Sequence, residues 1–595
     1  MDRGSQRSIL EWLTEDRYGW AGHFRWPLLS IVVGIVAGFG AILFEVLLRQ
    51  ALYYFLHLPA GFSEPSRAAE ASLVATMAAH RHWLYFIIPA LGGLVVGLLV
   101  MLLAPEAGGE GADAMIEAFH HREGYIRRRV PLVKIVVSAI TIGSGGSAGK
   151  EGPIAQIGAG FGSILASFLN LKPKVRRILV LAGAAGGIGA IFHAPLGAAL
   201  FAPEVLYREA EFESEAIMPC IVSSIVASSI FDQHFGRSAL FFPGHVDFAP
   251  RELLPYLVFG GFIALAGYIF IKVFFAARER VFGPLDLPRF LKPALGGFIL
   301  GVIAYLAPPV LDGGYGWIQT SMEGSLFWGL MLALGFLKIA ATSITVGSGG
   351  SGGILGPSVF IGAMLGGAFG FLGHQLAPSW VIHPNSFVLV GIGGFFGGVA
   401  KVPVSAIIMA SEMCGSYNLL VPLMLVASVA YLLLGRHSIY EKQLVDRLAS
   451  PAHLREFARG VLENMLVRDA MDERPVTLIP ENMPFEMLIK LVTGSQDSHF
   501  PVIDSQGKLI GILSINDVRE FLFEESLAKV VVARDVATSG VVTVSWNDTL
   551  QSALDKMAMI GVDELPVIQD ENPDKIVGMI SKRDIISYYH NRIAP

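Results

Sequence analysis

The sequence carries little charge for its length. Of its 595 residues only 16% are charged, whereas about 25% are charged in an ordinary soluble domain. Hydrophobic residues make up 53% of the chain. A soluble protein of this size needs more charge to cover its surface. The composition therefore excludes a soluble enzyme and indicates an integral membrane protein with many spans.

Cysteine is also scarce, and the chain has no excess of basic residues. Both cysteines, Cys220 and Cys414, lie in apolar runs, which argues against a disulfide framework or a cysteine metal site. The formal charge of 44 − 50 = −6 argues against a nucleic-acid partner. No cluster of His, Cys and Asp has metal-ligand spacing, and no nucleophile–base pair is visible. We therefore expect no required cofactor and no enzymatic activity.

Long apolar runs fill the chain up to about residue 440. Four of them are about 20 residues or longer, and they begin at Leu28, Trp83, Tyr256 and Leu326. Each can cross a hydrocarbon core of roughly 30 Å. Shorter apolar segments at 151–169, 178–203 and 353–375 are interrupted by Gly and Pro. Interrupted backbone survives in lipid only where protein or a water-filled cavity satisfies it, so these segments indicate a permeation site.

Two basic clusters, at 120–130 and 172–177, separate apolar segments. By the positive-inside rule they face the cytoplasm. Residues 1–27 contain no short apolar run with a cleavage site, so both termini are expected on the cytoplasmic side of a cell or inner membrane. We expect His120 and His121 to be solvated and His193 to be packed or hydrogen-bonded.

An internal repeat occupies the apolar part. GSGGSAGKEGP (143–153) and GSGGSGGILGP (347–357) are identical at eight of eleven positions, at an offset of 204. A second pair of segments, ending at Glu204 and Glu412, matches at an offset of 208. Two related halves with Gly-rich breaks predict a pseudo-symmetric transporter architecture.

The Gly-rich breaks carry the chemistry of an anion site. Each is followed by a proline suited to a first helical turn, Pro153 or Pro357. A helix N-terminus offers free N–H donors and partial positive charge, which favour an anion. The alternative is that these glycines serve close helix packing. Repetition of Ser, Gly and Pro at fixed offsets favours the anion site.

Glu151 lies inside the first break. A carboxylate in a membrane costs several kcal/mol, about 2.5 to 3.5 on insertion scales, so it is a functional candidate by default. At an anion site it can occupy the site as a tethered anion and leave when protonated. The alternative is an ion pair with Lys150 at a membrane edge.

With these motifs in place, the apolar part resembles the CLC family of chloride channels and anion/proton antiporters. Gly149–Pro153 matches the family's G(K/R)EGP segment, and Gly353–Pro357 matches its GxFxP segment, with Leu355 at the usual Phe. Tyr440 matches the pore-lining tyrosine. The resemblance implies an all-α polytopic membrane domain of two pseudo-symmetric inverted halves with broken, tilted helices, acting as a homodimer.

The resemblance also implies roles for single residues. Glu151 would be the gating glutamate. The anion would be bound by the group Gly149, Gly353, Ile354, Leu355 and Tyr440. The family's GSGIP segment aligns with Gly109–Asp113, which places Glu110 where a serine usually coordinates the anion. Glu110 is protonated, turned away, or facing a wider vestibule.

A second departure concerns protons. Antiporters of the family carry an inner proton-transfer glutamate, and Val205 stands at that position. Valine cannot relay a proton, and the adjacent Glu204, about 100° away on a helix, is the local substitute. Another carboxylate or a water chain is the alternative. The missing relay favours a channel.

The chain after residue 450 resembles tandem cystathionine-β-synthase (CBS) domains of α/β type. Each unit reads as strand, turn, strand and helix, with Asp517 and Asp584 at the helix starts. The resemblance makes both aspartates candidates for binding an adenine nucleotide through ribose hydroxyls. The alternative is that they are helix-capping acids.

The sequence thus predicts five segments with distinct roles. They are a cytoplasmic segment (1–27), a CLC-like transmembrane anion-transport domain (28–450), a linker (451–466) and two CBS domains (467–525 and 531–593). The predicted function is a voltage- or pH-gated chloride channel, gated by Glu151 and modulated by the CBS domains. The alternatives are a chloride/proton antiporter and a non-conducting, nucleotide-sensing membrane protein. The expected partners are chloride or another small anion, lipid and a second copy of the chain.

Overall fold

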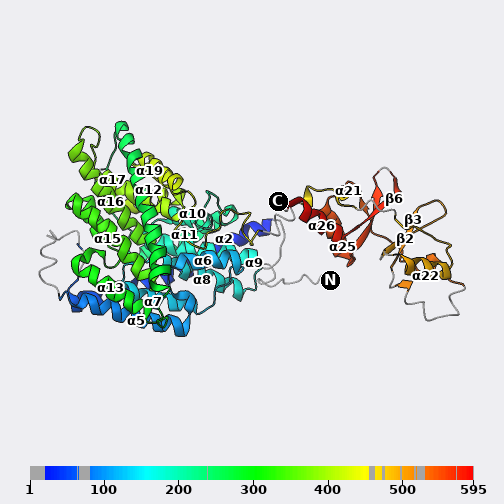
Figure 1. Ribbon diagram of the computed structural model, residues 1–595, viewed down its shortest axis with the longest axis horizontal. Coiled ribbons are helices and arrows are strands. Elements are labelled where there is room, and N and C mark those ends of the chain that lie inside the picture. The colour runs from blue at the N-terminus through cyan, green and yellow to red at the C-terminus, as the bar shows by residue number, and fades with distance from the viewer. Residues whose placement is uncertain are drawn as a thin grey trace, which may run out of the picture. The chain divides into compact units, whose positions relative to one another are not determined.

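The chain divides into two units, Met1–Ala452 and His453–Pro595 (Figure 1). The computed structural model describes residues 20–62, 65, 81–237, 239–244, 246–453, 462–471, 476–495, 497, 499–514, 517–518, 530–570 and 572–593. The predicted segment 1–27 and linker 451–466 lie partly outside these residues. Each unit is described by itself.

Among its described residues, the regular secondary structure of the first unit is helical. Its first half contains α2 (Trp20–Ala51), η1 (Leu52–His57), α3 (Leu58–Ala60), α5 (Leu84–Leu103), η2 (Pro105–Ala107), α6 (Gly111–His121), α7 (Val130–Gly143), α8 (Glu151–Phe168), α9 (Pro173–Phe192), α10 (Pro195–Glu204) and α11 (Ser214–Phe235). Its second half contains η3 (Pro250–Glu252), α12 (Leu253–Ala276), η4 (Ala277–Phe282), α13 (Lys292–Leu306), η5 (Pro308–Val310), α14 (Tyr315–Met322), α15 (Trp328–Gly347), α16 (Leu355–Leu376), α17 (Ser386–Ala400), α18 (Pro403–Cys414) and α19 (Leu420–Leu434).

The two halves repeat the same helix order, which confirms the predicted pseudo-symmetry. Helix α7 ends at Gly143 and α15 at Gly347, at the offset of 204, and α10 begins at Pro195 and α18 at Pro403, at the offset of 208. Helix α8 packs on α9 as α16 packs on α17. The halves meet where α5 packs on α13 and α10 on α18.

Proline and left-handed residues set the helix boundaries. Helices α10 and α18 each begin with a proline in the first turn, where its missing N–H is not needed. The residues that end α9 and α17, His193 and Lys401, are both left-handed, with φ of 52° and 61°. The segment 178–203 therefore contains parts of two helices. By contrast, α16 is unbroken, because Pro357 lies in its first turn.

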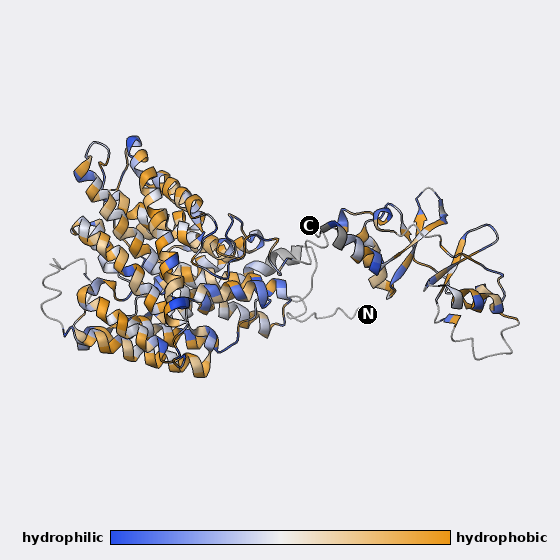
Figure 2. Ribbon diagram, viewed as in Figure 1, coloured by the Kyte–Doolittle hydropathy of each residue, from blue (hydrophilic) through white to orange (hydrophobic). Residues whose placement is uncertain are grey.

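Seven helical stretches among the described residues are long and apolar enough to cross a membrane. Figure 2 shows apolar residues predominating along the helices of the first unit. Large apolar side chains are exposed on them, such as Phe39, Leu306 and Leu432 at 61–75%. Monomeric soluble proteins rarely expose such extensive apolar surface, so these faces fit contact with lipid.

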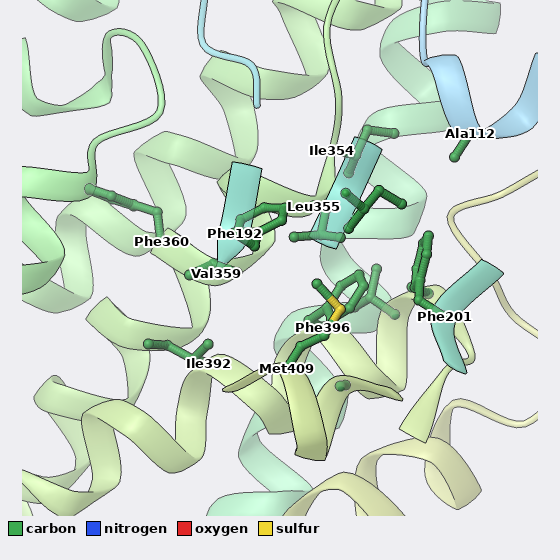
Figure 3. Packing of buried hydrophobic residues seen from close by; sticks show 14 of the residues in the cluster. Ala112, Phe192, Phe201, Ile354, Leu355, Val359, Phe360, Ile392, Phe396 and Met409 are labelled. Carbon is green, nitrogen blue, oxygen red and sulfur yellow. The ribbon is translucent and has the colours of Figure 1, made fainter. Parts of the chain in front are cut away.

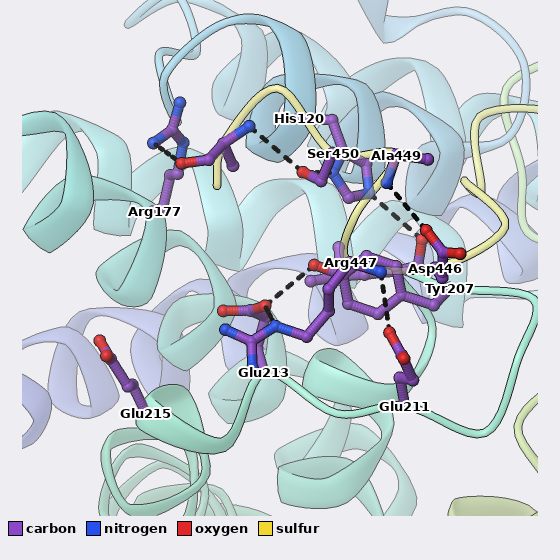
Figure 4. Close-up of polar contacts among 12 residues, drawn as sticks. His120, Arg177, Tyr207, Glu211, Glu213, Glu215, Asp446, Arg447, Ala449 and Ser450 are labelled. Carbon is purple, nitrogen blue, oxygen red and sulfur yellow. Dashed lines mark hydrogen bonds and ion pairs between the residues drawn. The ribbon is translucent and has the colours of Figure 1, made fainter. Parts of the chain in front are cut away.

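The segment after α19 folds back onto the first half (Figure 4). The ring of His120 contacts the hydroxyl of Ser450 at 2.8 Å and the carbonyl of Leu206 at 3.2 Å. Arg447 pairs with Glu213 at 3.1 Å. The prediction that His120 is solvated was wrong: it is buried, because its ring bridges two distant segments. His121 is exposed, and His193 pairs with Asp232 at 2.7 Å.

The second unit holds two three-stranded sheets. The elements of the first repeat are α21 (Val467–Ala470), β1 (Ile479–Pro480), α22 (Phe485–Gly494), β2 (His499–Ile503) and β3 (Leu509–Ser514). Those of the second are α24 (Ala533–Val536), β4 (Val544–Ser545), α25 (Leu550–Ile560), β5 (Glu564–Gln569), β6 (Asn572–Ser581) and α26 (Lys582–Ile593). In each sheet the first pair of strands is parallel and the second antiparallel.

Candidate functional site

The two Gly-rich breaks meet at the centre of the first unit. The amide of Gly149 donates to the carbonyl of Gly353 at 2.8 Å, and the amide of Gly353 donates back at 2.7 Å. This antiparallel pair joins the entries to α8 and α16. A Cβ on Gly353 would lie 2.5 Å from the amide nitrogen of Gly152, so close approach requires glycine here. The predicted residues Gly149 and Gly353 are therefore in direct contact.

Hydroxyl groups tie the two breaks together symmetrically. The amide of Ser147 donates to the hydroxyl of Thr345, and the amide of Ser351 donates to the hydroxyl of Thr141, both at 3.2 Å. These two bonds are images of each other at the offset of 204. The turns that precede them use Gly145 and Gly349, with φ of 96° and 103°, a conformation that a side chain disfavours.

Two buried lysines, not predicted from the sequence, hold the loops that lie beside the breaks. Lys134 on α7 donates to the carbonyls of Ala107 and Gly109 at 3.2 and 2.9 Å. Lys338 on α15 donates to carbonyls of the equivalent loop in the second half, including Val310 at 3.0 Å. The available signal was the repetition of a lysine in apolar helices at the offset of 204.

Glu151 begins α8 and is buried. The hydroxyl of Tyr315, on α14, donates to its carboxylate, and the amide of Gly356 also faces it. The alternative pairing with Lys150 is not observed, since the Lys150 amine lies 3.0 Å from Glu45 instead. The carboxylate of Glu151 is thus held through one oxygen by the Tyr315 hydroxyl and lies beside the Gly356 amide, while its other oxygen, Oε2, is buried with no hydrogen-bond partner among the described residues.

That amide belongs to the N-terminus of α16. The side chains of Ile354 and Leu355 are buried in the apolar cluster that also contains Ala112 and Phe201 (Figure 3). The first amides of a helix have no intrahelical partner and carry partial positive charge. A Cβ on Gly356 would lie 2.6 Å from the Glu151 carboxylate. Glu151 therefore occupies, as a tethered carboxylate, the place where α16 favours an anion.

Glu110 lies on the other side of the glycine pair. One carboxylate oxygen, Oε2, accepts from the amide of Asp113 at 2.8 Å and caps α6. The other, Oε1, is buried and has no hydrogen-bond partner among the described residues. A Cβ on Gly152 would lie 2.8 Å from this oxygen. The carboxylate of Glu110 is therefore only partly turned away from the glycine pair. One oxygen caps α6, and the other faces the backbone of Gly152, next to Glu151.

Tyr440 reaches the site from the loop after α19. The carboxylate of Asp113, a residue missed in the sequence, accepts from the amides of Glu441 and Lys442 at 3.3 and 3.1 Å. Tyr440 is buried, and the charges of Glu110, Asp113 and Glu151 all act on its hydroxyl. Residues more than 280 positions apart are thereby brought together.

Comparison with known proteins identifies the fold's relatives. The family model described as voltage gated chloride channel matches residues 92–435, and the CBS domain model matches 467–524 and 533–591. The chain belongs to the voltage-gated chloride channel, or CLC, family. It is also a tandem CBS protein.

Individual relatives carry two kinds of name. A putative chloride channel protein, ClcB-like, of Ralstonia nicotianae is 31% identical over 69% of this chain and 95% of its own length. An H⁺/Cl⁻ exchange transporter, ClcA, of Klebsiella pneumoniae is 28% identical over 71% of this chain and 89% of its own. A solved slow cyanobacterial Cl⁻/H⁺ antiporter superposes with a TM-score of 0.62 at 23% identity, covering 70% of this chain and 96% of that one.

Val205, predicted to stand at the family's inner relay position, directly follows Glu204 at the end of α10. Val205 is buried, and its carbonyl accepts from the amide of the Gln443 side chain at 2.8 Å. Glu204 accepts from the amides of Val404 and Ser405 at 3.0 and 2.8 Å, and from the Ser405 hydroxyl. It therefore caps α18.

Glu412 does the same for α10 in the other half of the CLC fold. Its carboxylate accepts from the amides of Leu196 and Gly197 at 3.2 and 2.7 Å. Two antiparallel helices thus cap each other's N-termini, with their carboxylates at the offset of 208. Glu204 and Glu412 are equivalent, and both are engaged in holding helices.

In the CBS domains Asp517 and Asp584 occupy matching places. Asp517 accepts from the amide and hydroxyl of Ser514, both at 2.7 Å. Asp584 accepts from the amide and hydroxyl of Ser581 at 2.9 and 2.6 Å. Each pair forms a capping box. The two domains also contact each other through His499 and Glu564, which lie 3.0 Å apart.

Proposed function

We propose that the protein exchanges chloride for protons across a membrane, with Glu151 as the group that binds the proton and competes with the anion. The observation that supports this most directly is the carboxylate of Glu151 at the N-terminus of α16, where an anion is favoured. An ionised Glu151 excludes the anion. A protonated Glu151 has no charge to hold it there, so the anion replaces it.

The names of the relatives also favour exchange over a gated channel. Two CLC relatives at 28% and 30% identity are named H⁺/Cl⁻ exchange transporters. The sequence favoured a channel because Val205 cannot relay a proton. That inference assumed that the relay must stand at position 205, and the proposal of exchange does not make this assumption. A channel stays the second candidate, since a relative at 31% identity bears a channel name.

The test uses the purified full chain in liposomes. A chloride gradient is imposed, valinomycin carries the balancing potassium, and a pH electrode records protons. Exchange predicts proton movement against its own gradient, driven by chloride. Chloride flux without proton movement would replace exchange with a channel. Nucleotide binding without chloride flux would instead support a sensor.

We further propose that the basic segment 120–130 faces the cytoplasm, with both termini on that side. The support is the positive-inside rule. We also propose that the protein is a homodimer. Apolar side chains on α10, α11 and α18, which pack together, are exposed, including Leu196, Met218 and Val404 at 43%, 71% and 42%. Crosslinking in native membranes is expected to trap a species of twice the chain's mass.

Adenine nucleotide binding by the CBS domains stays a prediction. It is carried by Asp517 and Asp584, whose capping bonds are those of helix-start acids. Titration calorimetry with ATP on the full chain checks it. Heat of binding that disappears in Asp584→Asn is the expected result.

A further inference from the structure

A cavity of about 980 Å³ leads from the surface of the first unit toward the glycine pair. Its lining includes the exposed residues Arg122 and Tyr125 of the basic segment 120–130 and, at its inner wall, Gly109 and Glu110. Water and anions therefore reach the neighbourhood of Glu110 from the side that carries the basic segment. Glu151 is not part of this lining.

The other carboxylates that line the cavity already have partners. Glu106 pairs with Arg127, Glu117 lies 2.5 Å from Arg122, and Glu441 lies 2.6 Å from Arg278. Asp113 holds the two amides of the Tyr440 loop. Among the described lining residues, Glu110 is the carboxylate with a buried oxygen that has no partner. An unpaired oxygen in such a place costs less free energy when it carries a proton.

Charged and titratable groups from several elements surround Glu110. On its own helix it faces Asp113, and from α7 it faces Lys134, whose amine is bound to two carbonyls rather than to Glu110. The Tyr440 hydroxyl feels the charges of both Glu110 and Glu151. Helix α8 packs on α6, and its residue Gly152 lies beside Glu110. The titratable residue next to Gly152 on this helix is Glu151. Arg278, Glu441 and Lys442 line the same cavity.

We propose that Glu110 is the inner proton-transfer residue of this protein, taking the role that Val205 cannot fill. A proton passes from water in the cavity to Glu110, and the O–H bond on Glu110 then breaks as one forms on Glu151. Glu204 does not serve, because all its hydrogen bonds go to the start of α18. This inference rests on the proposed exchange.

The same carboxyl links the anion to the proton. An ionised Glu110 repels an anion at the inner side of the glycine pair, whereas a neutral one does not. Linkage is reciprocal, so an anion bound there also favours the protonated form. At equilibrium, occupancy of the inner side by an anion and protonation of Glu110 therefore favour each other, in place of the serine ligand that the family resemblance implies at this position.

The experiment compares Glu110→Gln with Glu117→Gln, the same change at another carboxylate of the same cavity. Glutamine keeps an oxygen to accept the Asp113 amide, so the cap of α6 is retained. In liposomes Glu110→Gln is expected to conduct chloride while its proton coupling falls at least tenfold, and Glu117→Gln keeps the coupling of the unaltered chain. Coupling unchanged in Glu110→Gln would overturn the proposal while leaving exchange intact. Uncoupled flux in the unaltered chain would instead overturn exchange itself.

A second measurement does not depend on turnover. In a Glu151→Gln background, which removes the carboxylate that competes with the anion, chloride binding is measured by calorimetry at pH 5 and pH 9.5. The expected result is an affinity at least tenfold lower at pH 9.5, and no such change after Glu110→Gln is added. An affinity that varies with pH equally in both proteins would contradict the proposal.

Discussion

The two halves of the membrane unit share the polar residues that hold their helices and loops, but they differ at two acidic positions. Thr141 and Thr345, Lys134 and Lys338, and Glu204 and Glu412 occur as equivalent pairs, and each pair makes equivalent bonds. Glu151 and Glu110 have no such counterparts, because Leu355 and Gly314 stand at the offset of 204. The polar groups that are repeated hold helices and loops. Those that break the repeat lie at the proposed anion site.

Glu151→Gln tests an acid that has no counterpart in the other half, and its expected effect is the largest. Glutamine cannot exchange a proton and carries no charge to exclude the anion. Proton movement driven by chloride is expected to fall at least tenfold, while chloride flux rises and keeps only the pH dependence that Glu110 contributes. Paired chloride and pH electrodes on liposomes check this. Unchanged coupling would remove Glu151 from the transport cycle.

Tyr315→Phe releases the carboxylate without removing it. A hydrogen bond to a charged group is worth about 1.5–3 kcal/mol, so the balance between tethered carboxylate and bound anion shifts roughly tenfold or more toward the anion. Calorimetry is expected to show chloride binding that is tighter by about that factor. Affinity equal to that of the unaltered protein would mean that the Tyr315 hydroxyl does not hold Glu151 in solution.

Glu204→Ala and Glu412→Ala test the two acids that are equivalent in the two halves. Each leaves buried helix N-terminal amides without an acceptor, at a cost of about 1–3 kcal/mol. Both variants are expected to melt at lower temperature in detergent, by similar amounts, as followed by tryptophan fluorescence. A large loss in one and none in the other would break the equivalence of the two caps.

Thr141→Val and Thr345→Val give the smallest effect. Each removes one acceptor for a serine amide across the two breaks, worth about 1 kcal/mol. The melting temperatures are expected to fall slightly and equally. A change in proton coupling in either variant would show that the threonine hydroxyl groups take part in transport.

Much of the fold follows from local patterns. Apolar runs of sufficient length, the first-turn prolines Pro153 and Pro357 of α8 and α16, and the two repeats predict helices and halves correctly. The single apolar segment 178–203 contained a helix boundary because a left-handed residue, His193, precedes Pro195. Pattern alone does not reveal that a histidine adopts this conformation.

The site was predictable in its motifs and not in its distant contacts. Glu151, Gly149 and Gly353 stand in recognisable segments, and they meet as the repeat implies. Tyr315 and Asp113 have no signal of their own, because their importance comes from helices far apart in sequence that pack together. His120 was placed in solvent for the same reason, since its partner Ser450 is 330 residues away.

The most direct test measures proton coupling in Glu151→Gln and Glu204→Gln side by side. Both changes remove one buried carboxyl charge from the same unit, one outside the repeat and one inside it. Reversal potentials under opposed chloride and pH gradients are the readout. The account predicts that Glu151→Gln follows the chloride gradient alone, while Glu204→Gln still responds to pH as the unaltered protein does. Loss of the pH response in Glu204→Gln, with its retention in Glu151→Gln, would contradict it.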